Sequence, residues 1–259
     1  MQKQHYIAIF VSFIAVLILY IFVDTMPPKL KELEKSRSLN LEATGTKNII
    51  DKAMASLDKD DQSMIEALQM DIDKAKDDST KVKVLKVLAS AWYELDHPAT
   101  SAIYAEEIAG IEKTASSWSI AGTTFMICAR SEKNEKTRDF CIKRALSCLE
   151  TAISLDPEKV EPKINRALVY VDNPLQDNPM KGILMLRELN EEYPGNTSVL
   201  NQLASLALKT NQADKALERL NESYAIDPSN NMTACLLAMA YEMAGDAGKA
   251  MEFSKKCKK

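Results

Sequence analysis

The sequence predicts an all-α protein in which one transmembrane helix precedes a stack of helical hairpins. Three observations lead to this fold class. The 259 residues include only 7 Gly and 9 Pro, too few for a turn-rich β protein. The N-terminal part contains a long uncharged apolar segment. The C-terminal part repeats its small and apolar residues at an interval of 34.

The apolar segment runs from Ile7 to Val23 without a charged residue. As a helix, a segment of this length spans about 26 Å, which is enough for one bilayer crossing. No small-x-small cleavage site follows it, and Pro27 and Pro28 end the helix. A cleaved signal peptide and a buried core helix are the alternatives. We expect an uncleaved single-pass anchor in the lipid bilayer, with residues 1–6 as its N-terminal tail.

Flanking charges give one indication of the side of the membrane on which the hairpins lie. Lys29, Lys31, Lys35 and Arg37 follow the span, whereas only Lys3 precedes it. More Lys and Arg after the span favours a cytoplasmic location for the large domain. A short N-terminal tail is also common among anchors that leave the tail inside, so the exported or periplasmic side stays open.

The cysteines give a second indication of the compartment. The five are Cys128, Cys141, Cys148, Cys235 and Cys257. An odd number without a CxxC pair suggests neither a disulfide framework nor a zinc site. We expect reduced, buried thiols that behave as small apolar residues, which again favours the cytoplasm.

Three segments follow the anchor. Residues 24–45 are rich in charge and predict a juxtamembrane linker, either a solvated helix or a stalk. Residues 46–80 predict a helical hairpin with helices over 49–57 and 60–75. Residues 81–259 predict a superhelix built of further hairpins.

The repeats are strongest over 197–230 and 231–259, which align without a gap. Small residues recur on both helices of the hairpin. The aligned pairs are Ala204 with Ala238 and Ala216 with Ala250. Small side chains at these positions let two antiparallel helices approach closely. Asp227 before Pro228 ends the second helix, because a residue before proline is disfavoured in a helix.

This pattern resembles the tetratricopeptide repeat. Upstream, the spacing of Trp118, Gly122 and Phe125 is similar to the motif on the first helix of that family. The stretch from Gly122 to Ala145 is longer than its counterpart in the family by about three helical turns, which predicts that both helices of this hairpin are extended. The resemblance implies that residues 81–259 form an α-solenoid.

Two hairpins carry the pattern more loosely. In the first, helices are predicted over 82–94 and 99–112. In the second, they are predicted over 158–171 and 180–193. Two Asn-Pro steps predict a structured loop over 172–179.

The resemblance also implies a function, because members of this family bind protein or peptide partners in a concave groove lined by the first helices of the repeats. Similar architectures serve as accessory subunits or co-chaperones of membrane assemblies. On the family's frame, the residues expected to face the groove are Ser198, Asn201, Ser205, Leu208 and Lys209 in one repeat and Met232, Cys235, Met239 and Glu242 in the next. They would form a polar and methionine-lined trough for a peptide.

Composition argues against other classes of function. With 2 His and no nucleophile, phosphate-loop or metal-ligand motif, we expect no enzyme, no metal and no cofactor. The net charge of −4 argues against nucleic acid as a partner. The prediction is a membrane-anchored adaptor that holds protein partners. A self-associating scaffold, hence a homo-oligomer, and a ligand-binding or catalytic protein on a helical scaffold are the alternatives.

Overall fold

The computed structural model describes residues 45–257, and these residues form helices and no strands. The helices are α3 Thr46–Ser56, α4 Lys59–Lys74, α5 Asp78–Glu94, α6 Pro98–Glu112, α7 Ala115–Ser131, α8 Glu135–Leu155, α9 Val160–Asp172, α10 Lys181–Glu192, α11 Thr197–Lys209, α12 Ala213–Ile226, α13 Asn231–Met243 and α14 Ala247–Lys256. The all-α prediction is therefore confirmed for this part of the chain.

The chain divides into two units, Met1–Asn48 and Ile49–Lys259. The predicted anchor, residues 7–23, lies outside the described residues. Within residues 45–257, none of the helices combines the length and the apolar character that a bilayer crossing requires.

Side chains fix where many of the helices begin. Seven of the described helices start after a residue whose side chain accepts a hydrogen bond from a backbone N–H of the first turn. This contact satisfies a donor that has no partner within the helix. The capping residues are Asp58, Asp77, Thr114, Asn134, Asn196, Asn230 and Asp246.

The last two hairpins repeat each other in the backbone as well as in the sequence. The N-caps of α11 and α13 are Asn196 and Asn230, which are separated by one repeat length. The turns within these hairpins contain Asn211 and Gly245, separated by the same interval, and both have a positive φ, of 58° and 81°. Asn and Gly are the residues that adopt this left-handed conformation most readily, so the turn chemistry supports the register.

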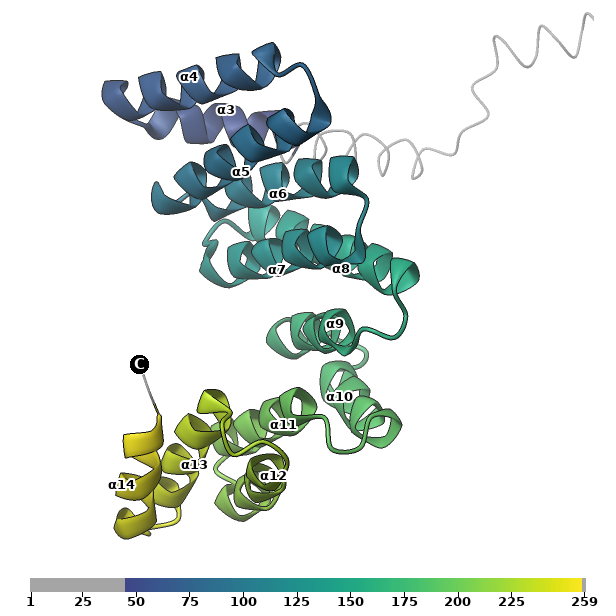
Figure 1. The fold of residues 1–259 in the computed structure, drawn as a ribbon, viewed down its shortest axis with the longest axis vertical. Coiled ribbons are helices and arrows are strands. Elements are labelled where there is room, and N and C mark those ends of the chain that lie inside the picture. The colour runs from purple at the N-terminus through teal and green to yellow at the C-terminus, as the bar shows by residue number, and fades with distance from the viewer. Residues whose placement is uncertain (1–44, 258–259) are drawn as a thin grey trace, which may run out of the picture. The chain divides into compact units, whose positions relative to one another are not determined.

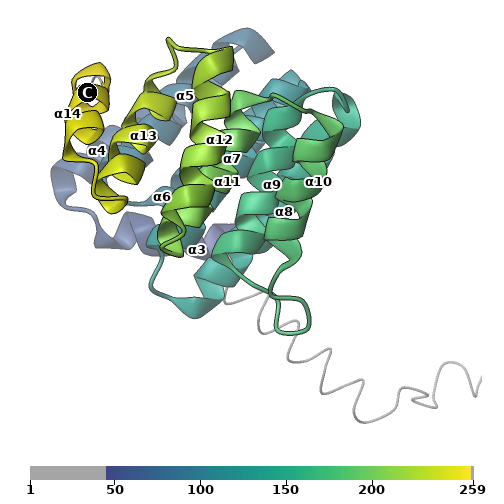
Figure 2. The same ribbon diagram turned by 90° about the horizontal axis from the view of Figure 1, so that it is seen from below.

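Hairpins follow one another in chain order, each packed on the next (Figure 1). Viewed from below, α9 lies beside α10 and α13 beside α14 (Figure 2). The first hairpin, α3–α4, shares an apolar cluster with α5 and α6, in which Ala53, Ile65, Leu85 and Ile108 are buried. Apolar contact between neighbouring hairpins is thus the main source of cohesion.

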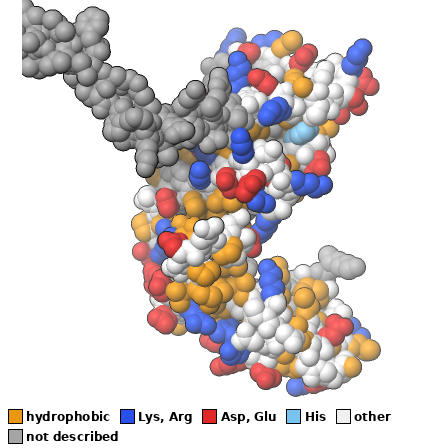
Figure 3. All heavy atoms as spheres, turned by 180° about the vertical axis from the view of Figure 1, so that it is seen from behind, with side chains coloured by type: hydrophobic (Ala, Val, Ile, Leu, Met, Phe, Trp, Pro, Cys, Tyr) orange, Lys and Arg blue, Asp and Glu red, His pale blue; other side chains and the backbone are white. Residues whose placement is uncertain are grey.

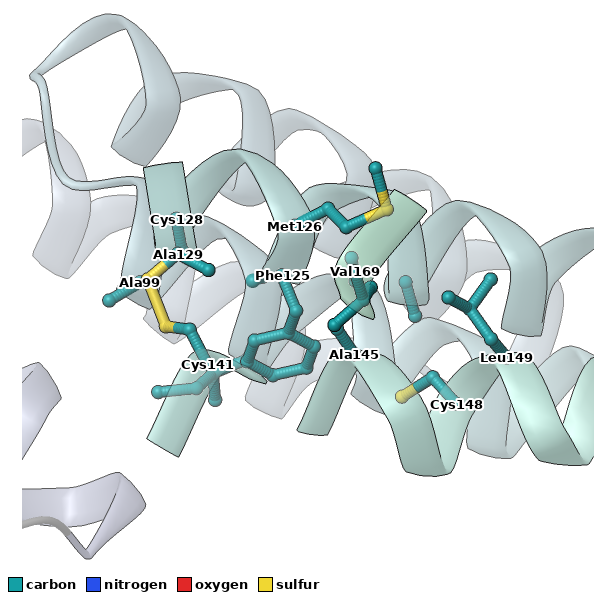
Figure 4. Close-up of a cluster of buried hydrophobic side chains, with 14 of the residues drawn as sticks. Ala99, Phe125, Met126, Cys128, Ala129, Cys141, Ala145, Cys148, Leu149 and Val169 are labelled. Atoms are coloured by element: carbon teal, nitrogen blue, oxygen red, sulfur yellow. A yellow bond between two sulfur atoms is a disulfide. The ribbon is translucent and has the colours of Figure 1, made fainter. Parts of the chain in front are cut away.

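The hairpin α7–α8 is the longest, with 17 and 21 residues. The predicted extension of both helices is therefore confirmed. Its two helices approach closely at Gly122, where an added Cβ would lie 2.6 Å from a carbon of Leu149. Phe125, Ala145 and Leu149 are fully buried in the cluster between these helices (Figure 4).

The prediction of reduced cysteines is wrong for four of the five. Disulfides join Cys128 to Cys141 and Cys235 to Cys257, and Cys148 is the free thiol. The first bridge crosses from α7 to α8 inside the core (Figure 4). Cysteines that are 13 residues apart across a hairpin turn become neighbours only when the hairpin forms, so no local sequence pattern predicts this disulfide.

Candidate protein-interaction surfaces

The predicted groove residues on α11 differ in exposure. Ser198 and Lys209 are exposed and Ser205 is half-buried. Asn201 and Leu208 are buried, at 3% and 6% exposed. Only the first three therefore offer side-chain surface to a partner.

The predicted groove residues on α13 are mostly open. Met232 and Met239 are 58% and 55% exposed, and Glu242 is exposed. Cys235 is half-buried and bound to Cys257. On the face shown in Figure 3, hydrophobic side chains reach the surface over this last hairpin, at the lower right.

A second surface, not predicted from the sequence, is a groove of about 480 Å³ lined by α5, α6 and α7. We call it the α5–α7 groove. Small or apolar residues make up most of its lining, including Ala105 and Ile108 of α6. Two large apolar side chains at its border are open to solvent: Tyr93 is 51% exposed and Ile120 is 61% exposed. Large exposed side chains beside a concave apolar surface are typical of a site that binds another protein.

Charge at the α5–α7 groove is unevenly compensated. The ammonium group of Lys86 lies 2.7 Å from the Glu112 carboxylate, so these two charges form a pair. Glu94 also lines the groove, and no ion pair or hydrogen bond to its carboxylate is found among the described residues. It is the last residue of α5, where the helix dipole is negative. This end of the groove therefore favours a cation.

The sequence of α7 contains a signal for this groove that is separate from the repeat pattern. Ser117, Ile120, Thr124 and Ile127 are spaced by three and four residues, so they share one face of α7. That face is distinct from the buried face that carries Phe125. Two isoleucines on a second face of a helix indicate a second contact surface.

A larger and more polar hollow, of about 980 Å³, lies at the ends of α7 and α9 and the start of α8. Lys209, one of the predicted groove residues, contributes to its lining. Arg130 and Asp172 form an ion pair of 2.6 Å there, and Arg138 and Asp139 add one charge of each sign. Because both cations and anions line it, this hollow does not select a ligand of one charge.

Cys148, the free thiol, is unsuited to act as a nucleophile. It is fully buried, and its sulfur lies 3.8 Å from a carboxylate oxygen of Glu106. Burial, together with the Glu106 charge, raises the pKa of the Cys148 thiol to about 12. The reactive thiolate is therefore scarce at neutral pH.

Glu106 itself sits between Cys148 and Arg144, whose guanidinium lies 3.3 Å away. Burial raises the pKa of the Glu106 carboxyl, and the charge of Arg144 partly offsets the rise. Within residues 45–257, no group of three or more His, Cys, Asp or Glu side chains is placed to hold a metal ion.

No family model matches the chain, and no curated protein matches it. Several solved structures are similar to it in fold. A tetratricopeptide repeat protein from Parabacteroides merdae is 17% identical, with 82% of this chain and 78% of that chain covered and a TM-score of 0.49. TTC0263, a thermophilic tetratricopeptide repeat protein from Thermus thermophilus, is 14% identical, with 81% and 95% covered and a TM-score of 0.48.

YrrB, described as a tetratricopeptide repeat protein with an unusual peptide-binding site, is 16% identical to this chain. The match covers 74% of this chain and 91% of that one, with a TM-score of 0.37. All three TM-scores are below 0.5.

Proposed function

We propose that this protein is a membrane-anchored scaffold that binds an apolar segment of a partner protein in the α5–α7 groove. The observation that carries the proposal is the exposure of Tyr93 and Ile120 beside an apolar hollow. Removing such side chains from water on binding contributes about 25 cal/mol per Å² of apolar surface. A volume of about 480 Å³ accommodates several apolar side chains of a partner.

The charge at Glu94 adds a preference to this binding. A Lys or Arg of the partner would pair with the carboxylate and with the negative end of α5. The preferred segment therefore has an apolar core with a basic residue at the Glu94 end. Its docking beside the membrane would suit an accessory subunit of a membrane assembly.

The experiment is a binding assay by fluorescence anisotropy with short synthetic peptides that have an apolar core and either Lys or Glu at one end. We expect the Lys peptides to bind more tightly. Ile120→Glu should abolish binding because it places a charge beside the apolar lining. Met70→Glu is the matched control, since Met70 is 57% exposed on α4 and does not line the groove.

Glu94→Lys separates the charge contribution from the apolar one. In this variant the preference should change from Lys to Glu peptides, while binding of uncharged apolar peptides is kept. Equal loss of binding in Ile120→Glu and Met70→Glu, or no effect of either, would contradict the groove as the site.

The proposed anchor is the apolar segment Ile7 to Val23, supported by its length and lack of charge. The full chain should stay with membranes during extraction at alkaline pH, and a variant lacking residues 1–24 should be released. Release of the full chain would contradict an integral anchor.

We propose the exported side of the membrane for the hairpins. The two disulfides support this location, because disulfides persist in oxidising compartments and are rare in the cytosol. Because four of the five cysteines are oxidised, the cysteines no longer favour the cytoplasm. Only the excess of Lys and Arg after the anchor still favours it. An impermeant protease added to intact cells should degrade the hairpins if they lie on the exported side. Hairpins that stay intact until the cells are lysed would contradict this location.

The exposed and half-buried members of the predicted groove on α11 and α13, apart from the disulfide-bonded Cys235, are proposed as a second contact surface. They are Ser198, Ser205, Lys209, Met232, Met239 and Glu242. The two exposed methionines favour self-association as a second candidate function, since a second copy would cover them. A molar mass measurement on residues 46–259 tests this: a dimer that Met239→Glu dissociates supports it, and a monomer at all concentrations contradicts it.

A further inference from the structure

A buried polar contact joins the last two hairpins. The side-chain amide of Asn201 donates to the hydroxyl of Thr233 at 2.9 Å, and that hydroxyl donates to the amide oxygen of Asn201 at 3.1 Å. The hydroxyl of Ser223 lies 3.0 Å from the same Thr233 oxygen. All three residues are buried, and they come from α11, α12 and α13. One hairpin thus uses Asn201 and Ser223 to hold the next.

The register of the repeat places cysteines at the corresponding positions of the last hairpin. Cys235 lies one repeat length after Asn201, and Cys257 lies one repeat length after Ser223. These two cysteines form a disulfide. In one repeat, Asn201 and Ser223 bind the following hairpin through hydrogen bonds. In the next repeat, the cysteines at the same two positions form a covalent bond within their own hairpin.

The two disulfides differ in exposure. Cys128 and Cys141 are both 0% exposed and belong to the apolar core cluster that contains Phe125 and Leu149. Cys235 and Cys257 are each half-buried, so solvent reaches their side chains. Thiol–disulfide exchange requires a thiolate to approach a sulfur along the S–S axis, and access therefore favours the second bridge.

α14 packs on α12 and α13 through a small set of side chains. Phe253 is its single buried residue. The Phe253 ring stacks on Tyr241 at 5.6 Å and meets Tyr224 edge to face at 5.2 Å. Ala250 is partly buried against the same cluster, and the Lys256 ammonium donates to the Tyr224 hydroxyl at 3.2 Å. A ten-residue helix is marginal on its own, so the position of α14 depends on these contacts and on the bridge.

We propose that Cys235–Cys257 is a thiol–disulfide exchange site, open to a dithiol reductant or dithiol protein, and that its redox state decides whether α14 stays docked. One thiolate of the reductant attacks a sulfur of the bridge, forming a mixed disulfide while the other cysteine leaves as a thiolate and takes up a proton. The second thiolate of the reductant then displaces the remaining cysteine. The bridge gains two electrons and two protons, and the reductant leaves as a disulfide.

Reduction would release the C-terminal end of α14 from α13. Tyr241, which is 9% exposed under Phe253, would then become accessible. The site thereby controls exposure of an apolar surface, whereas Cys128–Cys141 stays closed within the core.

The test uses the full chain in detergent, treated with a graded series of dithiothreitol. Free thiols are trapped with a charged alkylating reagent and located by peptide mass analysis, and hydrogen exchange is followed in parallel. We expect labelling of Cys235 and Cys257 at least about tenfold faster than labelling of Cys128 and Cys141. Over the same period the amides of α14 should lose protection while those of α7 and α8 keep theirs.

A matched variant, Cys235→Asn with Cys257→Ser, installs the residue pair of the preceding hairpin at the same positions. Its α14 exchange should not respond to reductant. The proposal is overturned if both bridges are reduced at the same rate, if Cys235 and Cys257 label without reductant, or if α14 keeps its protection after their reduction.

Discussion

Single glycines determine how closely some helices of this protein pack. At Gly182, on α10, an added Cβ would lie 2.5 Å from the carbonyl oxygen of Ala167 and 2.5 Å from the amide nitrogen of Val171. Both atoms belong to the backbone of α9 and cannot rotate away. Gly110, on α6, is exposed, and apart from its chain neighbours and its own helix backbone no atom lies within 4 Å of the corresponding position.

These two sites predict opposite effects of one substitution. Gly182→Ala should lower the free energy of unfolding by about 1–3 kcal/mol, because the helices must separate. Gly110→Ala should raise it by about 0.5–1 kcal/mol, because alanine restricts the unfolded chain and favours a helix. Urea denaturation followed by circular dichroism measures both. A stabilised Gly182→Ala variant would mean that α9 and α10 are farther apart than described.

Glu106 predicts a pH dependence. Because its pKa is raised in the folded protein, folding favours the protonated carboxyl. The stability that Glu106 contributes is therefore present below its ordinary value of 4.5 and is lost as the pH rises through the raised pKa. The variant Glu106→Gln lacks this titration, so its stability relative to the original protein should increase over that interval and then level off.

Urea denaturation of both proteins at a series of pH values between 4 and about 8 checks this sign. Carboxyls with lowered pKa values, such as Glu192, contribute equally to the pH dependence of both proteins, so their contribution cancels in the difference. A relative stability that falls with pH would show that Arg144 dominates over burial at Glu106.

At the scale of the element, the contact around Thr233 predicts how the last hairpins are coupled. Thr233→Val keeps the shape of the side chain and removes the hydroxyl that meets Asn201 and Ser223. Two buried polar groups are then left without this partner, which should cost about 1–3 kcal/mol of stability. Thr151→Val is the control, since the Thr151 hydroxyl bonds only to the backbone of its own helix.

Hydrogen exchange locates the effect of Thr233→Val. Amides of α13 and α14 should lose protection first, and those of α5 to α8 should be unaffected. If the loss is spread evenly over all helices, the last hairpins do not form a separately coupled element. The double variant Ser223→Ala, Thr233→Val should lose less stability than the sum of the two single losses, because both substitutions remove the same contact.

The helices themselves could be predicted well from the sequence, and the reason is local. In α11 to α14 the period of small and apolar residues, the capping Asn residues and the turn residues Asn211 and Gly245 all agree. Pro174 and Pro179 indicate the loop between α9 and α10, and it is found between Asp172 and Lys181. Such signals act within one or two turns of helix.

Contacts between elements could not be predicted in the same way. Asn201 occupies a position that faces a groove in the family frame, yet it is buried against Thr233, 32 residues away. The partners of Cys128 and Cys235 depend on how hairpins fold back and pack. The α5–α7 groove is formed by three helices, so it exists only in the folded stack.

At the scale of the whole molecule, the proposed arrangement is a stack of hairpins beside a membrane, with a partner-binding groove on α5 to α7 and a redox-sensitive last hairpin. The groove and the Cys235–Cys257 bridge lie on different helices. Reduction of the bridge is therefore not expected to change peptide binding at the groove. The two proposals can fail independently of each other.

The proposed function requires that a partner protein occupies the α5–α7 groove in the cell. The most direct measurement places a photo-crosslinking amino acid at position 120 or 93 in the full chain, with position 70 as control, and irradiates intact cells. We predict one crosslinked partner of the same mass at positions 120 and 93, none at position 70, and loss of the adducts on Glu94→Lys. Adducts at all three positions, or at position 70 alone, would show that the α5–α7 groove is not the binding site.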